Sequence, residues 1–271
     1  MEKRVSVSIS EGVADVRLVR ADKMNALDAA MFDALVATSE RLAREKGVRA
    51  VVLSGEGRSF CAGLDMGRFA AMTEKGGNGI EGGEQRDLTA RTHGLANFPQ
   101  QAVWGWRQLP VPVIAAIQGV AFGGGFQLAL GADMRFLSPD ARLSIMEIKW
   151  GLVPDMAGTP ILAGLVRDDI LRELTYTGRI FSAQEAMSYG VATRICDDPR
   201  ATAFEVAREI AGKSPEAIRA AKRLLNNLSV DPGPALLAES VEQMQLMGSA
   251  NQLEAVRANI DKRAPRFADV G

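Results

Sequence analysis

Three short, almost wholly apolar segments separated by helical patterns constrain the fold of this chain most. They are VRAVVLSG (48–55), VPVIAAIQG (111–119) and ADMRFLS (132–138). Short apolar runs of this kind are typical of strands that are buried on both faces of a parallel sheet. Because parallel neighbours need a crossover between them, the pattern predicts an α/β fold with right-handed connections.

Residues 5–46 add a hairpin and a capped helix to this pattern. Segments 5–9 and 13–19 both alternate apolar and polar residues, and Glu11-Gly12 lies between them. This arrangement predicts a β-hairpin with one buried face. Asp28 is placed to cap a following helix that ends before Gly47, and helical spacing marks its inner face: Met31, Leu35, Thr38 and Leu42.

The character of the chain changes near residue 196. Beyond it the patterns are helical, first over 199–212, then from Ser214-Pro215 to Asn226, then in two more helices. We therefore predict a core of residues 1–196 and a C-terminal helical subdomain of residues 197–271. Segment 66–87 mixes glycines with charges and has few large apolar side chains, which predicts a mobile loop.

Bulk composition excludes several classes of function. The 271 residues carry a formal net charge of −1, so no net positive charge favours the binding of nucleic acid. Two cysteines provide neither a disulfide framework nor metal-ligand spacing, so we expect no metal. The start MEKRVSVSIS lacks the apolar core of a signal peptide, and no apolar run is long enough for a membrane span. We expect no membrane association and a cytoplasmic location.

The stretch GVAFGGGFQLALGAD (119–133) carries the strongest chemical signal. A buried strand, a glycine turn and a helix present unpaired backbone N–H groups, which bind a phosphate or a developing oxyanion. The stretch fits neither of the phosphate-binding motifs G-x-G-x-x-G and G-x-x-x-x-G-K-S/T, which favours an oxyanion hole over a phosphate site. The alternative is that the glycines only allow close packing. Segment 57–66 also follows a strand and carries Gly63, so two turns could each give one N–H to the oxygen of a thioester enolate.

Two carboxylates stand among apolar residues in 142–159, namely Glu147 and Asp155. Burial would raise their pKa values toward neutrality, which suits proton transfer. The alternative for Glu147 is a surface ion pair with Lys149 or Arg142. Asp155 is equally compatible with a turn or with the cap of a helix near Ala157.

Other reactive side chains are better explained by packing. Cys61 lies beside the glycine turns but has no obvious base near it in sequence, so we interpret it as a buried apolar residue. His93, the single histidine, is interpreted as structural rather than as part of an acyl pocket. The same choice between acyl tunnel and core applies to the large aromatic residues Trp104, Trp106, Trp150, Phe98 and Phe122.

Taken together, these motifs resemble the crotonase superfamily, the enoyl-CoA hydratases and isomerases. The shared landmarks cover about residues 5–195, and the tail KRAPRF is also similar. They are DKMNAL (22–27), SGEGRSFCAGLDM (54–66), PVIAAIQGVAFGGGFQLALGAD (112–133), EIKWGLVPDMAGT (147–159) and GRIFSAQEAMSYGVA (178–192). The resemblance implies a crotonase-like spiral of repeated β-β-α turns whose C-terminal helices assemble trimers or hexamers.

The resemblance also implies site residues. The amide N–H groups of Leu64 and Gly124 would form the oxyanion hole for the thioester carbonyl. Lys23, Met24, Ala26 and Ala62 match the part that holds coenzyme A. Coenzyme A would belong to the acyl-CoA substrate, so no separate cofactor is expected.

One position departs from the hydratase pattern. Hydratases of this family have an acid two positions after the glycine triplet, where this chain has Gln127. Dienoyl-CoA isomerases resemble this chain in two acids: one matches Glu147, and an aspartate eight positions later matches Asp155. They differ from it at the position of Gln127, where they too have an acid. Our hypothesis is a CoA-thioester isomerase that uses Glu147 and Asp155, with Gln127 as a hydrogen-bonding, non-acidic neighbour at the substrate. The alternatives are a hydratase that relies on Glu147 and a non-catalytic scaffold that binds CoA thioesters.

Overall fold

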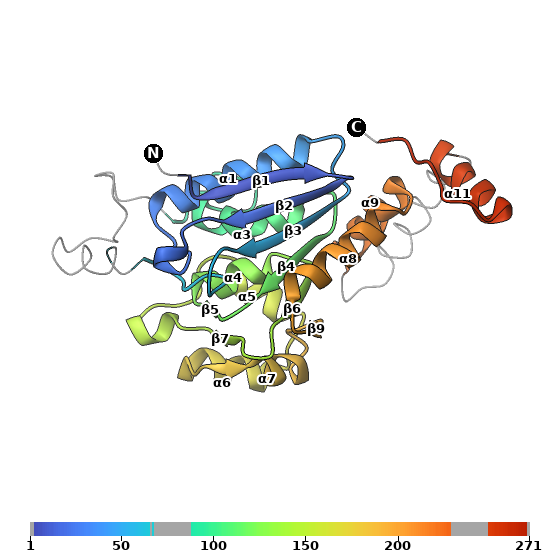
Figure 1. The fold of residues 1–271 in the computed structure, drawn as a ribbon. Coiled ribbons are helices and arrows are strands. Elements are labelled where there is room, and N and C mark those ends of the chain that lie inside the picture. Colours follow the sequence, from blue (N-terminus) through green and yellow to red (C-terminus); the bar gives the residue numbers. More distant parts are fainter. Residues whose placement is uncertain (1–2, 66, 68–87, 229–248, 270–271) are drawn as a thin grey trace.

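The computed structural model describes residues 3–65, 67, 88–228 and 249–269, and its centre is a six-stranded sheet (Figure 1). The strand order is β1-β2-β3-β4-β6-β9. The strands are β1 (Val5–Ser10), β2 (Val13–Leu18), β3 (Ala50–Gly55), β4 (Val113–Ile117), β6 (Met134–Leu137) and β9 (Arg194–Ile195). From β2 onward every neighbouring pair is parallel, as the apolar runs predicted.

The predicted hairpin is confirmed. Strands β1 and β2 pair antiparallel, with Ser10 opposite Val13. The two connecting residues both have positive φ, 51° at Glu11 and 76° at Gly12. Positive φ at both positions is the condition for the tight turn whose twist matches a hairpin.

The sheet is covered by helices on both faces. Residues of β3 alternate between two cores: Val51 and Leu53 pack into the larger core, and Ala50 and Val52 pack into the smaller one. The helices α1 (Ala29–Arg44), α3 (Phe98–Gln108) and α4 (Gly124–Leu130) contribute to the larger core. Helix α8 (Pro199–Ala211) covers the opposite face through Ala203, Ala207 and Ala211.

Helix α1 begins where the sequence predicted it. The Asp28 side chain accepts a hydrogen bond from the Met31 N–H at 2.8 Å, the geometry of an N-cap. The same carboxylate also pairs with Arg4 at 2.9 Å and with Arg20 at 3.6 Å. The cap therefore ties the helix to both ends of the hairpin.

A second sheet of three short strands lies below the main sheet in Figure 1. Strands β5 (Val120–Phe122) and β7 (Arg142–Ser144) are parallel, and β8 (Phe181–Ser182) is antiparallel to β7. The 3₁₀ helix η2 (Glu147–Trp150) and the helices α5 (Gly158–Leu162), α6 (Asp168–Thr177) and α7 (Ala183–Ser188) follow in the same region. The segment with the predicted carboxylates therefore begins in β7 of the second sheet and ends in α5.

The C-terminal part is helical in the described residues, as predicted. Helix α8 is capped by Asp198, and α9 (Pro215–Asn226) and α11 (Ala250–Asp261) follow. The buried Lys222 of α9 pairs with Asp133 at 2.7 Å, which fixes α9 to the end of the sheet. Because α8 shares a core with the sheet, the division at residue 196 stays a prediction. The predicted mobile loop lies, except for residue 67, outside the described residues, as does the segment between α9 and α11.

Within the described ranges, no helix combines the length and the apolar character that crossing a membrane requires.

Candidate active site

The glycine triplet forms the turn between β5 and helix α4. Gly123 has φ 49° and ψ −121°, a conformation that a side chain rarely allows. A methyl group on Gly125 would lie 2.8 Å from the Cβ and the Sγ of Cys61 and would overlap the Cys61 carbonyl oxygen. The glycines therefore allow helix α4 to lie directly against the chain at Cys61, so the close-packing interpretation is correct for Gly125.

The second glycine turn is joined to the first by backbone hydrogen bonds. The Cys61 N–H donates to the Val120 carbonyl at 3.0 Å, and the Phe122 N–H donates to the Cys61 carbonyl at 3.1 Å. Gly63 has φ 91°, and a Cβ there would lie 3.8 Å from the Gly124 nitrogen. The structure thus brings together the two turns that carry Leu64 and Gly124. Neither amide N–H donates a hydrogen bond to any other described residue.

The residues predicted to hold coenzyme A lie beside the same turn. Lys23 ends the 3₁₀ helix η1 (Ala21–Lys23), and Met24 follows in the left-handed region with φ 48°. The Ala62 N–H donates to the Met24 carbonyl at 2.9 Å, and the Leu27 N–H donates to the Gly63 carbonyl at 2.7 Å. The buried Ala26 lies within this loop, so all four predicted residues are neighbours.

Two side chains that the sequence analysis did not single out hold this loop. Arg20 donates to the Ala26 carbonyl at 3.0 Å and pairs with Asp65 at 2.6 Å, across 45 positions of sequence. The fully buried Asn25 donates to the carbonyls of Ser59 and Phe60, at 2.9 and 3.1 Å. The position of Asn25 within DKMNAL was a possible signal, whereas no local pattern links Arg20 with Asp65.

Glu147 lies beside the glycine turn rather than on an open surface. Its Oε1 is 3.5 Å from the place that a Cβ on Gly123 would occupy. It accepts a hydrogen bond from Gln127 Nε2 at 2.6 Å, and its other oxygen is buried without a hydrogen bond in the described part of the chain. The predicted alternative of a surface pair with Lys149 or Arg142 does not occur.

Burial raises the pKa of the Glu147 carboxyl above its ordinary value of 4.5. Hydrogen bonds from its own backbone and from Gln127 oppose that rise, and the negative charge of Asp155 adds to it. A buried carboxyl with a raised pKa can accept and return a proton near neutral pH.

Asp155 lies on the exposed turn before helix α5. The described residues that line a cavity of about 300 Å³ include it, together with Leu95, Trp104, Pro154 and Thr159. Glu147 is outside that lining, although the charge of Asp155 raises the pKa of Glu147. Helix α5 has Ala157 at its N-cap and no side-chain cap bond, so Asp155 does not cap the helix.

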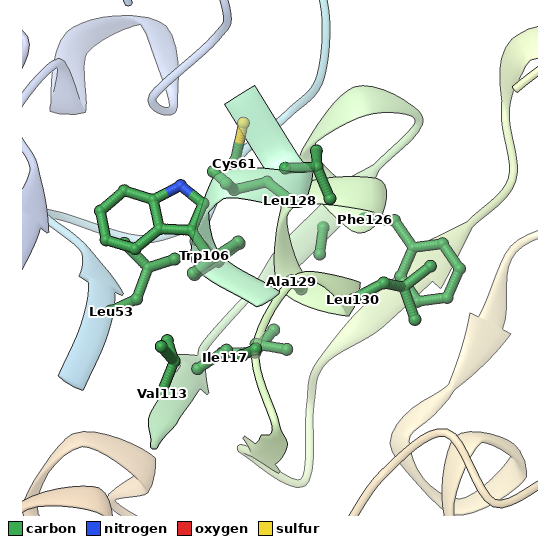
Figure 2. Close-up of a cluster of buried hydrophobic side chains, with 14 of the residues drawn as sticks. Leu53, Cys61, Trp106, Val113, Ile117, Phe126, Leu128, Ala129 and Leu130 are labelled. Carbon is green, nitrogen blue, oxygen red and sulfur yellow. The ribbon is translucent and has the colours of Figure 1, made fainter. Parts of the chain in front are cut away.

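Of the other reactive candidates, Cys61 lies in the hydrophobic core, whereas His93 lies at a cavity. Burial raises the pKa of the Cys61 thiol to about 12, which leaves it protonated and unsuited to nucleophilic attack. Figure 2 shows Cys61 among apolar side chains that include Trp106 and Leu128. His93 contacts Thr92 at 2.9 Å and lies 3.8 Å from Glu40, and it lines a separate cavity of about 330 Å³. In the described ranges no three His, Cys, Asp or Glu residues cluster as metal ligands.

The chain is similar in sequence to known proteins over nearly its whole length. Residues 8–270 match the family model described as enoyl-CoA hydratase/isomerase. The chain is 32% identical to a carnitinyl-CoA dehydratase of Proteus mirabilis, over 98% of this chain and 99% of the relative. It is 31% identical to a peroxisomal Delta(3,5)-Delta(2,4)-dienoyl-CoA isomerase of Arabidopsis thaliana, over 92% and 90% of the two chains.

A solved structure confirms the predicted fold. The crystal structure of an enoyl-CoA hydratase from Bacillus anthracis superposes with a TM-score of 0.87 at 31% identity, covering 98% of this chain and 99% of that one. The crotonase-like α/β fold that the resemblance implied is therefore the fold of this protein.

Proposed function

Since the chain belongs to the enoyl-CoA hydratase/isomerase family, we propose that it shifts double bonds in an acyl-CoA thioester by proton transfer through an enolate. The observation that carries this proposal is the environment of Glu147. This carboxyl is buried beside the glycine turn, has a raised pKa, and has one oxygen held by Gln127. Such a group can remove the proton from C2 of a bound thioester.

The enolate would be stabilised by the N–H groups of Leu64 and Gly124. Hydrogen bonds join their two turns, and Gly63 lies close to the Gly124 nitrogen. Two donors aimed at the thioester oxygen oppose the negative charge that forms there when C2 loses its proton. Removal of one such donor typically costs about 2.7–4 kcal/mol of transition-state stabilisation.

Gln127 favours isomerisation over hydration. A hydratase of the two-carboxylate type needs an acid at this position to orient and split water. Here the amide nitrogen donates to Glu147, and the amide oxygen accepts from the Met156 and Gly158 N–H groups at 2.8 and 3.0 Å. An amide does not exchange protons with water or substrate near neutral pH, so the second acid would have to lie elsewhere.

Asp155 is the second acid that we propose. For a 3,5-dienoyl-CoA, Glu147 takes the proton from C2, and the electron pair spreads through the conjugated system to C6. A proton that Asp155 takes up from solvent and delivers at C6 gives the 2,4-diene, and Glu147 then releases the C2 proton to solvent. The interaction of its charge with Glu147, and its place on a cavity of about 300 Å³, support this role.

A hydratase that works through Glu147 is the second candidate. Its support is the exposed position of Asp155, together with the names of relatives such as the Bacillus anthracis hydratase. A CoA-thioester-binding scaffold is the third candidate. The coenzyme A-binding role of Lys23, Met24, Ala26 and Ala62, a homotrimeric or hexameric assembly and a cytoplasmic location belong to the same proposal.

The experiment presents the protein with 2-trans-enoyl-CoA and with 3,5-dienoyl-CoA and follows the ultraviolet absorbance of each. Formation of the conjugated 2,4-diene at a rate well above hydration supports the isomerase. Fast hydration without any diene shift refutes it and favours the hydratase. Binding of both esters with turnover of neither, in wild type and in Glu147→Gln alike, favours the scaffold.

A further inference from the structure

We propose that Gln127 is a positioning residue that fixes which oxygen of Glu147 faces the substrate and ties Glu147 to the turn that carries Asp155. This inference rests on the proposed function for its chemistry and on the contacts of Gln127 for its geometry. The Gln127 residue is 2% exposed, and its side chain reaches two segments that are far apart in the sequence.

The orientation of the Gln127 amide follows from its partners. The backbone N–H groups of Met156 and Gly158 can only donate, so the atom that faces them is the amide oxygen. The amide nitrogen therefore faces Glu147, and it donates to Oε1 at 2.6 Å. Both ends of the amide are engaged, so its rotation would break three hydrogen bonds at once.

Packing holds the Gln127 side chain in this position. A Cβ on Gly158 would lie 2.8 Å from both the Cγ and the Oε1 of Gln127. A larger residue at 158 would displace the glutamine. The absence of a side chain at Gly158 thus lets the turn of residues 156–158 close over the amide.

This arrangement leaves a single oxygen of Glu147 for chemistry. Oε1 is held by Gln127, whereas Oε2 is buried and makes no hydrogen bond with the described residues. The donor hydrogen bond stabilises the ionised carboxylate, which keeps Glu147 able to act as a base despite its burial. Oε2 is therefore the atom that takes the C2 proton.

The charged groups around Glu147 are few in the described part of the chain. Asp155, across the turn, acts on it directly. Helix α4 and strand β5 carry no charged residue, and Arg142 of β7 donates to the backbone carbonyls of Asp140 and Ala141. On α6, which packs against η2, the acidic side chains pair with arginines: Asp168 with Arg172, Asp169 with Arg167 and Glu173 with Arg179.

The identity of residue 127 then sets the protonation of Glu147. In Gln127→Glu the carboxylate oxygen that replaces the amide nitrogen would lie against Glu147 Oε1, and the two groups would share one proton. In Gln127→Met the donor is lost without a new charge. We expect the Glu147 titration to move up by more than about one pH unit in the first variant and by less in the second.

The test measures two quantities in wild type, Gln127→Glu and Gln127→Met. The first is the Glu147 titration, followed by carbon NMR of protein labelled at the glutamate carboxyl carbons and identified by its loss in Glu147→Gln. The second is the pH profile of kcat and KM for 3,5-dienoyl-CoA. We expect kcat of Gln127→Met to fall ~10–100-fold with KM nearly unchanged, since misplacement by about 1 Å costs on that order.

Gln118→Met is the matched control. Gln118 is half-buried and donates to the carbonyls of Gly55 and Gly57 at 2.6 and 3.2 Å, with no bond to Glu147. Its replacement should leave the Glu147 titration in place. If Gln127→Met does not fold, Gln127→Glu still tests the role of residue 127, because it keeps an oxygen that can accept from the Met156 and Gly158 N–H groups.

The outcomes separate this inference from the proposed function. A Glu147 titration that Gln127→Glu leaves at its wild-type pH overturns the positioning role. A wild-type protein that turns over neither CoA ester overturns the proposed function, while the titration still decides the role of Gln127.

Discussion

The contact between the glycine turn and Cys61 predicts a sharp difference between two adjacent alanine substitutions. Gly124 and Gly125 both lie at the start of α4, and neither has a positive φ. Alanine gains helix propensity of about 1 kcal/mol over glycine, to a similar degree at each position. Any difference between the two variants therefore reports the space around the added methyl group.

The structure shows which atoms the added methyl group would meet at each position. At Gly125 the methyl would overlap the Cys61 carbonyl oxygen and lie 2.8 Å from Cys61 Sγ, in a segment held to β5 by backbone hydrogen bonds. At Gly124 it would meet Leu27 Cδ1 and Met156 Sδ, each at 2.9 Å, and both are atoms of flexible side chains. Overpacking against a fixed group costs about 1–3 kcal/mol, so Gly125→Ala should be less stable than Gly124→Ala by about that amount. Gly124→Ala should stay within ~1 kcal/mol of wild type.

Urea unfolding at equal protein concentration measures both variants, because assembly makes stability depend on concentration. Expressed as melting temperature, the difference between the two variants is on the order of 2–12 °C for a chain of this size. If Gly125→Ala unfolds at the same urea concentration as Gly124→Ala, or Gly124→Ala loses more stability than Gly125→Ala, the close packing of α4 on Cys61 is refuted.

Three further predictions concern charged groups. Because the folded pKa of Glu147 is raised, its contribution to stability is full below pH 4.5 and is lost as the pH rises through the raised value. Glu147→Gln should therefore unfold at higher urea than wild type at pH 7 and lose this advantage at pH 4; a constant difference would contradict the raised pKa. Lys222→Met leaves the Asp133 carboxylate without its buried partner and should lower the free energy of unfolding by about 3–5 kcal/mol in urea; an unchanged midpoint would show that the pair is solvated. Asp155→Asn should slow diene formation ~100-fold or more while Glu147-dependent exchange of the C2 proton continues, as followed by proton NMR, and equal losses of both would assign Asp155 a structural role.

The main sheet could be predicted from the sequence because its strands have clear patterns. The buried strands β3 and β4 are apolar at nearly every position, and the hairpin alternates with period two. The strands of the second sheet are two or three residues long, too short to show a period. Their pairing depends on tertiary contacts, so the second sheet was not predicted.

The residues of the candidate site also differ in whether the sequence near them gives a signal. The glycine turns and Glu147 could be singled out because glycine and a carboxylate in apolar surroundings are local signals. The three hydrogen bonds of Gln127 could not, because one is made with Glu147, 20 positions away, and two are made with a turn 29 and 31 positions away. The ion pair of Arg20 and Asp65 could not be predicted either, since two charged residues 45 positions apart form no local sequence pattern.

The measurement that tests the account most directly follows the C2 proton of 3,5-dienoyl-CoA by NMR in heavy water, with wild type and with Glu147→Gln. We predict that wild type exchanges this proton and forms the 2,4-diene, and that Glu147→Gln is slower in both by ~100-fold or more, since it keeps the shape of the site without the base. Exchange at the wild-type rate in Glu147→Gln would contradict the assignment of Glu147 as the group that removes the proton.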